Sequence, residues 1–388
     1  MLNFEFLNPT RIIFGRNTES QVGEQVKAMG SKCLLHYGRA SIKKSGLYDK
    51  VTASLSQAGV DFVELGGVRA NPYLSLIREG VALCKKESVD CILAVGGGSV
   101  IDSAKAIAMG AVMEGDVWPL YIGQGAPPAN TLPTGNVLTI PAAGSESSMF
   151  SVITNEDGWY KRSVSGPPLF PRFAIINPEL SFTLPQYQIA CGCVDILAHM
   201  MERYFTQVEH VDASDRMIEG LMRSVIYNSP LTVHNPTDYN SRAEICWAGT
   251  LAHNSLLDRG RIGDWVSHGI GAEMSALYDI AHGASLSIVI PAWMKHVYKH
   301  ARGRFVQFAV RVMDVDLAFA DEDAIILESI ARLERFFVSI GMPVRVGQAD
   351  IPTDRFREMA EKVVQFGKRG NILSVNADDC EEIFKLTV

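Results

Sequence analysis

The chain has 388 residues, which is long for a single core, so its length predicts two domains. Its 47% hydrophobic and 20% charged residues are typical of an ordinary globular protein. The net charge of −7 argues against a surface that holds nucleic acid through phosphate contacts, so a small-molecule activity is expected.

The N-terminal stretch MLNFEFLNPTRIIFG lacks a basic segment followed by an apolar core, and no later run approaches the roughly eighteen apolar residues of a membrane span. We therefore expect a cytoplasmic protein that does not enter a membrane. The extended residues 3–14 offer a pairing edge, which favours a homodimer.

Short apolar runs rich in β-branched residues predict strands in the first half, and segments of helical period such as SLIREGVALCKKES separate them. This alternation is typical of a parallel sheet covered by helices. The predicted strands are 33–38, 61–66, 91–98, 137–142 and 173–180.

After residues 181–188 the strand-like runs nearly stop, and apolar residues recur at three- and four-residue spacing. The sequence therefore predicts an α/β domain at 1–184 and an all-helical domain at 185–388. A cleft between two such domains is the default place for a ligand.

A glycine-rich turn follows the strand-like run CILAV, and a helical pattern begins near Val100. Glycines let the backbone approach a bulky anion, and the start of a helix offers unpaired N–H groups, so the turn suits a pyrophosphate. It lacks the G-x-G-x-x-G spacing, and a tight turn between strand and helix explains it equally well. The residues of this turn are Gly96, Gly97, Gly98 and Ser99.

Two further features belong to the same region. Asp102 and Lys105 stand in the first helical turns, where they face either the ligand or, more simply, solvent. The segment TIPAAGSESS, residues 139–148, is a second loop of small and hydroxyl residues after a strand. In a parallel sheet this loop would line the same end as the glycine turn.

The helical half contains two pairs of candidate metal ligands. Asp195 and His199 are four residues apart and so lie on one helix face, although a plain carboxylate–histidine hydrogen bond also explains that pair. His268 and His282 would be about 21 Å apart on one straight helix. They can share an ion only if the helix ends and the chain turns near 277–280. The four side chains would then supply three nitrogens and one oxygen, a set suited to Zn²⁺ or Fe²⁺ with room for a substrate oxygen.

The remaining histidines and the cysteines show no comparable pattern. The Cys191–Cys193 pair has no second pair to complete a tetrahedral site, and an odd set of seven cysteines is typical of reduced thiols. The cysteines are at 33, 84, 91, 191, 193, 246 and 380. Histidines 36, 210, 234, 253, 296 and 300 have no partner at ligand spacing and are interpreted as surface or satisfied interior residues.

The sequence resembles the iron-containing alcohol dehydrogenases, and within them the branch of butanol dehydrogenases and broad-range aldehyde reductases. The resemblance runs through nearly the whole chain and rests on the combination of NPTRIIFG, GGGSVIDSAKAIA, LTIPAAGSES, CVDILAHMMERY and YDIAHGASLSIVIPAW. It implies a dehydroquinate synthase-like fold, with an N-terminal dinucleotide-binding α/β domain and a helical metal-binding domain. It also implies Fe²⁺, with Zn²⁺ as the alternative, on the ligands Asp195, His199, His268 and His282, the set that spacing suggests.

The resemblance further implies three cofactor loops. The pyrophosphate loop falls on Gly96, Gly97, Gly98 and Ser99 with Asp102 near the nicotinamide end, and a second loop runs from Thr139 through Ser145. The adenosine end falls on YGRASIKKSG, which includes Gly38, Arg39 and Ser41. Related members that use NADP carry small residues there, whereas NAD-using relatives tend to carry an acid. Arg39 can form charge-assisted hydrogen bonds to a 2′-phosphate, so we predict NADP(H), with NAD as the alternative and an ordinary surface arginine as the competing interpretation.

One position departs from the family pattern. Many members have a histidine four residues after the first ligand of the H…H pair, associated with the nicotinamide and with proton transfer, and this chain has Ala272 there. We predict hydride transfer between NADP(H) and a primary alcohol or aldehyde such as butanol or butanal, chiefly as an aldehyde reductase. The alternatives are a degenerate relative that binds metal or nucleotide with little turnover, and a polyol dehydrogenase or dehydroquinate synthase-like enzyme on the same fold.

Overall fold

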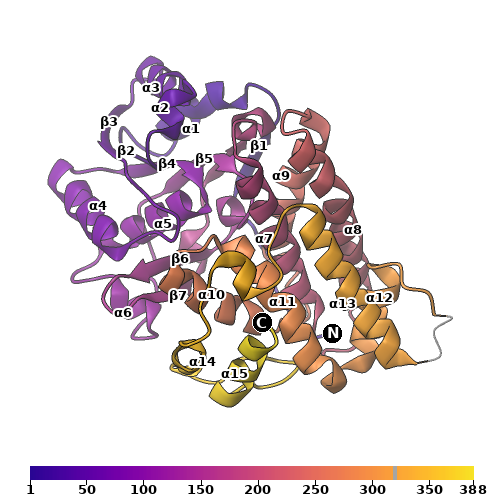
Figure 1. The fold of residues 1–388 in the computed structure, drawn as a ribbon. Helices are drawn as coiled ribbons and strands as arrows, with labels where there is room; N and C mark the ends of the chain where they lie inside the picture. Colours follow the sequence, from indigo (N-terminus) through magenta and orange to yellow (C-terminus); the bar gives the residue numbers. More distant parts are fainter. Residues whose placement is uncertain (318–320) are drawn as a thin grey trace. The chain divides into compact units, whose positions relative to one another are not determined.

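The computed structural model describes residues 1–317 and 321–388. The chain divides into two compact units, each with its own core (Figure 1). Leu7–Leu184 forms an α/β unit, and Pro185–Val388 joins Met1–Phe6 in a helical unit. The predicted class, an α/β domain followed by a helical domain, is confirmed.

The α/β unit is built on a six-stranded sheet in the order β1-β8-β5-β4-β2-β3, and all its strand pairs are parallel. Strand β4 is buried along its whole length, which is expected of a parallel sheet covered on both faces. Strand β1 at the sheet edge was not among the predicted strands. The strands are β1 (Arg11–Phe14), β2 (Lys32–Tyr37), β3 (Asp61–Leu65), β4 (Cys91–Gly97), β5 (Thr134–Ile140) and β8 (Phe173–Ile176).

The strand order reverses between β2 and β4, because β3 pairs with one edge of β2 and β4 with the other. In open parallel sheets, ligands bind outside the carboxyl ends of the strands at such a reversal. The loop at 38–41 follows β2, and the glycine turn spans the end of β4. Two of the three predicted cofactor loops therefore lie at the reversal point of this sheet.

An antiparallel hairpin and six helices complete the α/β unit. The hairpin, β6 (Phe150–Asn155) and β7 (Tyr160–Ser165), was not predicted, although Asp157-Gly158 between its strands is a typical turn pair. The helices are α1 (Val22–Lys27), α2 (Ser41–Lys44), α3 (Leu47–Gln57), α4 (Leu74–Glu87), α5 (Gly98–Val112) and α6 (Trp118–Tyr121).

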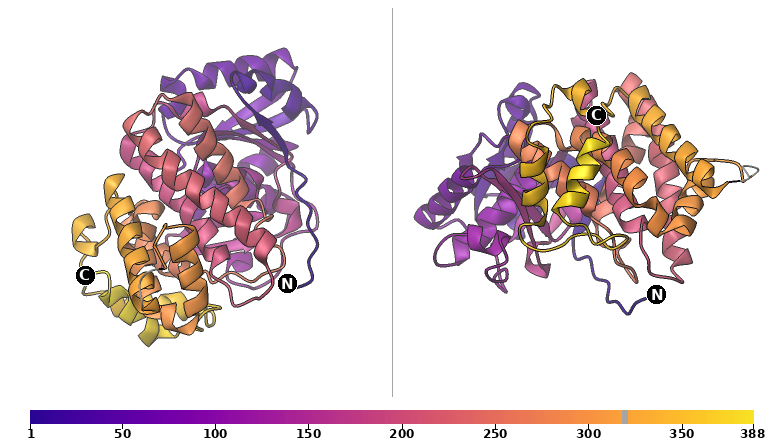
Figure 2. Two further views of the ribbon diagram at one scale, coloured as in Figure 1. Left: turned by 90° about the vertical axis from the view of Figure 1, so that its right-hand side faces the viewer. Right: turned by 60° about the horizontal axis from the view of Figure 1, so that its bottom comes forward.

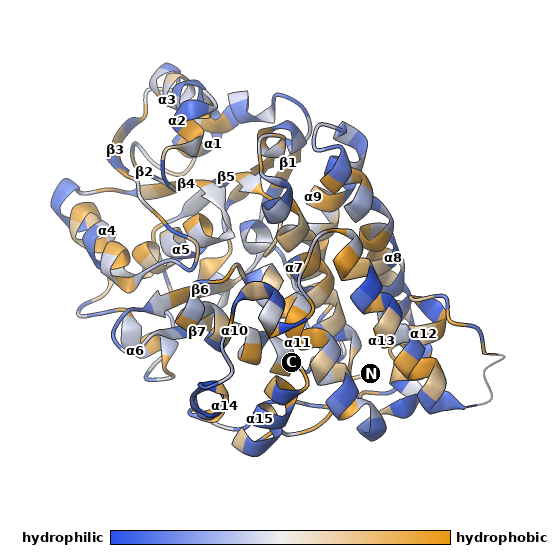
Figure 3. Cartoon of the chain, in the orientation of Figure 1, coloured by the Kyte–Doolittle hydropathy of each residue, from blue (hydrophilic) through white to orange (hydrophobic). Residues whose placement is uncertain are grey.

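The helical unit has a buried centre and an amphipathic outer layer. Its centre includes the aromatic cluster of Phe205, Trp293 and Phe305. Helix α13 carries both hydrophobic and hydrophilic residues (Figure 3), and its buried residues recur at three- and four-residue spacing, as expected of a helix with one buried face. The helices are α7 (Gln186–Tyr204), α8 (Asp212–His234), α9 (Tyr239–His253), α10 (Val266–Tyr278), α11 (His282–Val297), α12 (Arg302–Arg311), α13 (Glu322–Ser339), α14 (Phe356–Val364) and α15 (Ala377–Lys385).

Short 3₁₀ turns occur between these elements, and the first residues form an extended segment (Figure 2). Among the described residues, no helix combines the length and the hydropathy that crossing a membrane would require. The 3₁₀ turns are η1 (Thr18–Gln21), η2 (Ser145–Ser147), η3 (Pro167–Leu169), η4 (Pro178–Ser181), η5 (Tyr298–His300) and η6 (Val346–Ala349).

Candidate metal centre and cofactor loops

Helix α7 places Asp195 and His199 on one buried face. The two residues are one turn apart, and both side chains are almost completely inaccessible to solvent. The Nδ1 atom of His199 lies 3.7 Å from the Oδ1 atom of Asp195. This separation is longer than a hydrogen bond, so these two atoms of Asp195 and His199 are not hydrogen-bonded to each other.

The chain turns between the other two candidate ligands. Helix α10 ends at Tyr278, Asp279 adopts a left-handed conformation with φ +52°, and α11 begins at His282. His268 near the start of α10 and His282 therefore meet, with ring centroids 5.4 Å apart. The bend that a shared ion requires is present in the structure.

Three of the four predicted ligands form one tight group. Donor atoms of Asp195, His268 and His282 all lie within 4.8 Å of one another, and the Nε2 atom of His268 is 3.9 Å from Asp195 Oδ1. His199 is not a member of that group, but its ring lies beside it, 4.7 Å from the ring of His268 between centroids. All four residues belong to the helical unit.

The donor set fits a divalent ion. Within the described parts of the chain, His199 Nδ1 and His268 Nε2 are buried atoms that make no hydrogen bond. Ligand atoms placed ~2.1 Å from a tetrahedral ion stand about 3.4 Å apart, which is close to the distances of these nitrogens from the carboxylate. Burial and the neighbouring His253 and His268 hold the pKa of His199 well below its ordinary value, so the ring is in the neutral, metal-binding form.

Two residues beside the cluster were not found by sequence reasoning. Glu202 accepts a hydrogen bond of 2.8 Å from His268 Nδ1. His253, interpreted above only as a surface or satisfied interior residue, lies with its ring 4.4 Å from that of His199. Its Nδ1 accepts from Arg203 Nη2 at 2.9 Å, because a guanidinium has no acceptor atom. The spacing of Glu202 from Asp195 was a usable signal, whereas nothing local in the sequence indicated His253.

In the α/β unit, close packing demands glycine at the turn after β4. A Cβ atom on Gly96 would lie 2.4 Å from the Val100 side chain, and one on Gly97 would lie 2.9 Å from Ile140. Helix α5 begins at Gly98, two residues earlier than predicted, and no side chain of the described chain caps it. Its first N–H groups are therefore open to an anion, although the packing alone also explains the glycines.

The second loop lies directly against the first. Strand β5 pairs with β4, and a Cβ atom on Gly98 would come within 3.0 Å of Ala143 Cβ. Thr139 is near the end of β5 and Ser145 opens the turn η2. The two loops thus occupy neighbouring positions at the carboxyl end of the sheet, as expected for a parallel arrangement.

Asp102 and Lys105 do not face solvent, so that simpler interpretation was wrong. Both are buried, and Lys105 Nζ donates to the carbonyl oxygens of Ser145, Ser148 and Phe150 at 2.7 to 2.9 Å. Asp102 Oδ1 accepts from the Ser145 hydroxyl at 2.5 Å. Burial lowers the pKa of Lys105 to about 8 and raises that of Asp102. The pair fastens the second loop to helix α5.

At the end of β2, Arg39 and Ser41 are exposed, while Gly38 lies against α5 with its would-be Cβ 3.9 Å from Val100. Among the described residues, Arg39 makes no ion pair and no hydrogen bond. Nearby, Glu64 accepts hydrogen bonds from Tyr37, Tyr48 and Lys43. The Glu64 carboxylate is therefore engaged by side chains of the protein, whereas the Arg39 guanidinium is available to a ligand.

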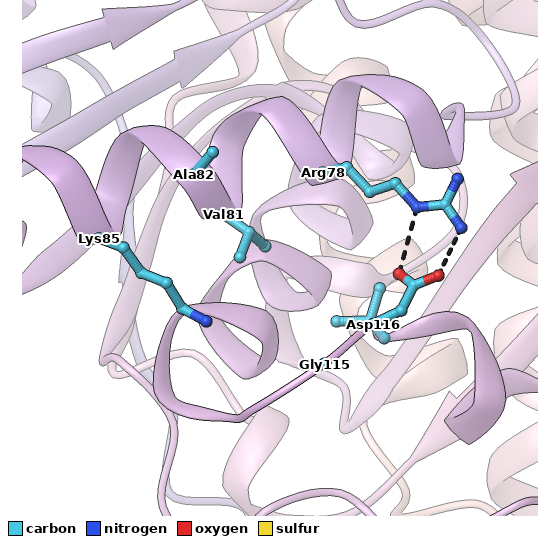
Figure 4. A pocket seen from close by; sticks show the side chains of 7 residues that line it. Arg78, Val81, Ala82, Lys85, Gly115 and Asp116 are labelled. Carbon is cyan, nitrogen blue, oxygen red and sulfur yellow. Dashed lines mark hydrogen bonds and ion pairs between the residues drawn. The ribbon is translucent and has the colours of Figure 1, made fainter.

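A shallow groove of about 430 Å³ on the α/β unit contains none of these residues (Figure 4). It lies between α4 and the segment after α5, and the Arg78–Asp116 ion pair borders it. Its remaining lining residues are Val81, Ala82, Lys85, Gly115 and Val117. The groove shares no lining residue with the glycine turn, and the histidine cluster belongs to the other unit.

A parallel sheet with loops at its reversal point, joined to a helical unit with an aspartate–histidine cluster, is the arrangement expected of a nucleotide-dependent oxidoreductase with a metal site. Family comparison identifies the particular family. Residues 9–178 match the family described as iron-containing alcohol dehydrogenase, and residues 189–388 match the C-terminal model of the Fe-containing alcohol dehydrogenase family. The chain therefore belongs to the iron-containing alcohol dehydrogenase family and is an oxidoreductase of alcohols and aldehydes.

Several relatives match over nearly their full length. The chain is 41% identical to the probable NADH-dependent butanol dehydrogenase 1 of Bacillus subtilis, with 100% of both chains covered. It is 33% identical to the NADPH-dependent aldehyde reductase YqhD of Escherichia coli, over 95% of this chain and 94% of the relative. A crystal structure of NADH-dependent butanol dehydrogenase A from Thermotoga maritima matches with a TM-score of 0.96 and 40% identity, covering 100% of this chain and 99% of that chain.

Proposed function

We propose that the chain is a metal-dependent alcohol dehydrogenase that transfers hydride between NADP(H) and a primary alcohol or aldehyde such as butanol or butanal, and that it works chiefly as an aldehyde reductase. The observation that carries the proposal is the convergence of Asp195, His268 and His282 donor atoms within 4.8 Å. The names of the butanol dehydrogenase and aldehyde reductase relatives support the substrate class.

Asp195, His199, His268 and His282 would hold the ion, with Fe²⁺ as the proposed metal and Zn²⁺ as the alternative. A divalent ion supplies Lewis acidity that polarises a carbonyl oxygen. The chain itself supplies one carboxylate and three imidazoles from packed helices. Because these side chains are held by α7, α10 and α11, their spacing is set before any ligand arrives.

The cofactor would bind across the reversal point of the sheet. Gly96, Gly97, Gly98 and Ser99 would receive the pyrophosphate at the open start of α5, and the loop from Thr139 to Ser145 would line the neighbouring edge. Arg39, exposed beside Gly38 and Ser41, supports NADP(H), because its guanidinium is available for a 2′-phosphate. The names of the relatives point both ways, to NADH in Bacillus subtilis and to NADPH in Escherichia coli.

Asp102 contributes indirectly in this proposal. Its carboxylate accepts hydrogen bonds from the Ser145 hydroxyl and from the Val152 backbone N–H. Asp102 would therefore hold the second loop in place beside the nicotinamide end of the cofactor.

A homodimer and a cytoplasmic location also stay predictions. The edge strand β1 and the exposed side chains of Phe4, Phe6 and Leu7 support pairing with a second copy.

The experiment combines metal analysis with NADPH oxidation. Wild type is expected to bind about one divalent ion per chain and to oxidise NADPH with butanal, while His268→Ala and His282→Ala lose both properties. His210→Ala is the matched control, because that histidine is 89% exposed and lies outside the cluster. Full metal content in both cluster variants would refute the site.

A further inference from the structure

We propose that Glu202 is a positioning residue of the metal centre, which fixes the ring of His268 with its Nε2 atom toward the ion. The inference rests on the proposed metal site. Glu202 would not touch the metal or the substrate and would act only through His268.

Glu202 shares a helix face with two of the proposed ligands. It follows Asp195 by seven residues and His199 by three on α7, and seven residues are nearly two full turns. Its side chain is therefore directed to the same side as theirs, and the residue is 2% exposed. A glutamate so completely buried needs partners for its oxygens.

The side chain of Glu202 accepts four hydrogen bonds from the first residues of α10 and from Trp265, which precedes that helix. Oε1 accepts from His268 Nδ1 at 2.8 Å, from the His268 backbone N–H at 2.9 Å and from the Ser267 hydroxyl at 2.6 Å. Oε2 accepts from the Trp265 backbone N–H at 2.6 Å. Each oxygen faces one backbone N–H, which can only donate, and the acceptor-only carboxylate accepts from all four groups at once.

These contacts determine the tautomer of His268. The carboxylate can only accept, so Nδ1 must carry a hydrogen, and Nε2 is left as the ring nitrogen that can bind a metal. That Nε2 atom lies 3.9 Å from Asp195 Oδ1 and makes no hydrogen bond to the described residues. The nitrogen that is available to a metal is thus the one directed at the other ligands.

The same carboxylate also fixes the backbone beneath the ring. Trp265, which precedes α10, has a left-handed φ of +65°, and no side chain of α10 caps the helix from within. Glu202 accepts from the backbone N–H groups of both Trp265 and His268, and Asp264 Oδ1 accepts from that of Val266 at 3.3 Å. The Glu202 side chain of α7 therefore holds both the start of α10 and the ring of the third ligand.

The test compares Glu202→Gln with Glu219→Gln. Glutamine keeps the size of the side chain, but its amide N–H₂ would face the backbone N–H of Trp265. Glu219 is a matched control, since it is also buried and accepts from Tyr204 and Gln307 away from the cluster. The measurements are the dissociation constant of Zn²⁺ by chelator competition and the visible absorption spectrum of the Co²⁺-loaded protein, for the folded variants.

We expect Glu202→Gln to bind Zn²⁺ about 10- to 100-fold more weakly and to alter the Co²⁺ bands, as is usual when an outer partner of a ligating histidine is lost. Glu219→Gln should keep both properties. Wild-type affinity and an unchanged Co²⁺ spectrum in Glu202→Gln would overturn the inference. An effect of equal size in both variants would do the same, because it would indicate general destabilisation.

Two further measurements keep the outcomes distinct. If His282→Ala retained wild-type Zn²⁺ affinity, the proposed metal site itself would fail, whatever Glu202→Gln does. If Glu202→Gln did not fold, ¹⁵N NMR of the Zn²⁺-loaded wild type would decide through the His268 ring. A hydrogen on Nδ1 supports the inference, and a hydrogen on Nε2 overturns it.

Discussion

Gly283 offers a test of whether helix packing sets the distance between the proposed ligands. It follows His282 at the start of α11, and a Cβ atom there would lie 2.0 Å from the carbonyl oxygen of Cys191 and 2.6 Å from its carbonyl carbon. Cys191 stands one turn before Asp195 on α7. Real Cβ contacts essentially never fall below 3.0 Å, and backbone cannot swing aside as a long side chain can.

Gly283→Ala must therefore move α11 away from α7 by about 1 Å, the difference between the 2.0 Å contact and the 3.0 Å limit. His282 on α11 would move away from Asp195 on α7 by a similar distance. A misplacement of ~1 Å in a catalytic site can cost about 10²-fold in rate. Overpacking of a well-packed core also costs typically 1–3 kcal/mol. We expect about a hundredfold loss of butanal-dependent NADPH oxidation and weaker metal binding. We also expect the unfolding free energy to fall by about 1–3 kcal/mol.

The assay measures initial rates, metal content and urea unfolding of Gly283→Ala beside Gly220→Ala. Gly220 lies inside α8, and a Cβ atom there would meet nothing within 4 Å. That control should keep its activity and gain ~0.5–1 kcal/mol, since alanine is the better helix former. If Gly283→Ala kept wild-type rate and metal content, the contact between α7 and α11 would not be what holds the ligands in register.

Three further changes test the cofactor loop, the departure from the family pattern and a buried acid. Arg39→Ala should weaken NADPH binding about 10- to 100-fold by fluorescence titration and leave NADH binding nearly unchanged, and equal affinities of the wild type for both cofactors would contradict it. Ala272, one turn after His268 on α10, cannot carry a proton, so Ala272→His should raise turnover on butanal with unchanged metal content, within the ~10²- to 10⁴-fold that acid–base assistance contributes. Unchanged turnover across the pH range would show that position 272 does not limit the reaction. Burial, and then the neighbouring Glu202 carboxylate, raise the pKa of Asp264 to about 6. An acid whose pKa is raised in the folded protein stabilises the fold at pH values below its unfolded pKa near 4, and this contribution is lost as pH rises through 6. The unfolding free energy of wild type minus that of Asp264→Asn should therefore fall by about 2–3 kcal/mol between pH 4 and 7. A difference that does not depend on pH would refute this.

Four of the five strands that the sequence predicted, β2, β4, β5 and β8, are mostly buried, whereas the fifth, β3 at the sheet edge, is partly exposed. Runs such as CILAV at β4 are continuously apolar, which is the pattern of a central parallel strand. The hairpin β6–β7 escaped prediction because FSVITN and YKRSVS mix polar with apolar residues and are partly exposed. Strand β1 is only four residues long, and at the sheet edge it pairs on one side with β8.

At the candidate site, the sequence predicted the residues that are related by local helix geometry and missed those that depend on distant contacts. Asp195 and His199 are visible in the sequence because an i, i+4 pair lies on one helix face whatever the tertiary fold. Glu202 continues that face, but its role depends on donors more than sixty residues away at the start of α10. His253 reaches His199 only through the packing of α9 on α7, which no local pattern encodes.

Asp102 and Lys105 show why a charged residue near a predicted site need not face the ligand. Burying an ammonium group costs several kcal/mol unless it is hydrogen-bonded, and Lys105 recovers that cost through backbone carbonyls and the Ser145 hydroxyl at 2.7 to 2.9 Å. The carbonyls of Ser145 and Ser148 belong to the second loop, that of Phe150 begins strand β6, and the helix that carries Lys105 begins at the glycine turn. The charge is therefore used to hold two loops at a fixed separation. If these loops bind the cofactor as proposed, a loop that Lys105 orders in advance loses less freedom on binding, and the buried contact then raises cofactor affinity without touching the cofactor.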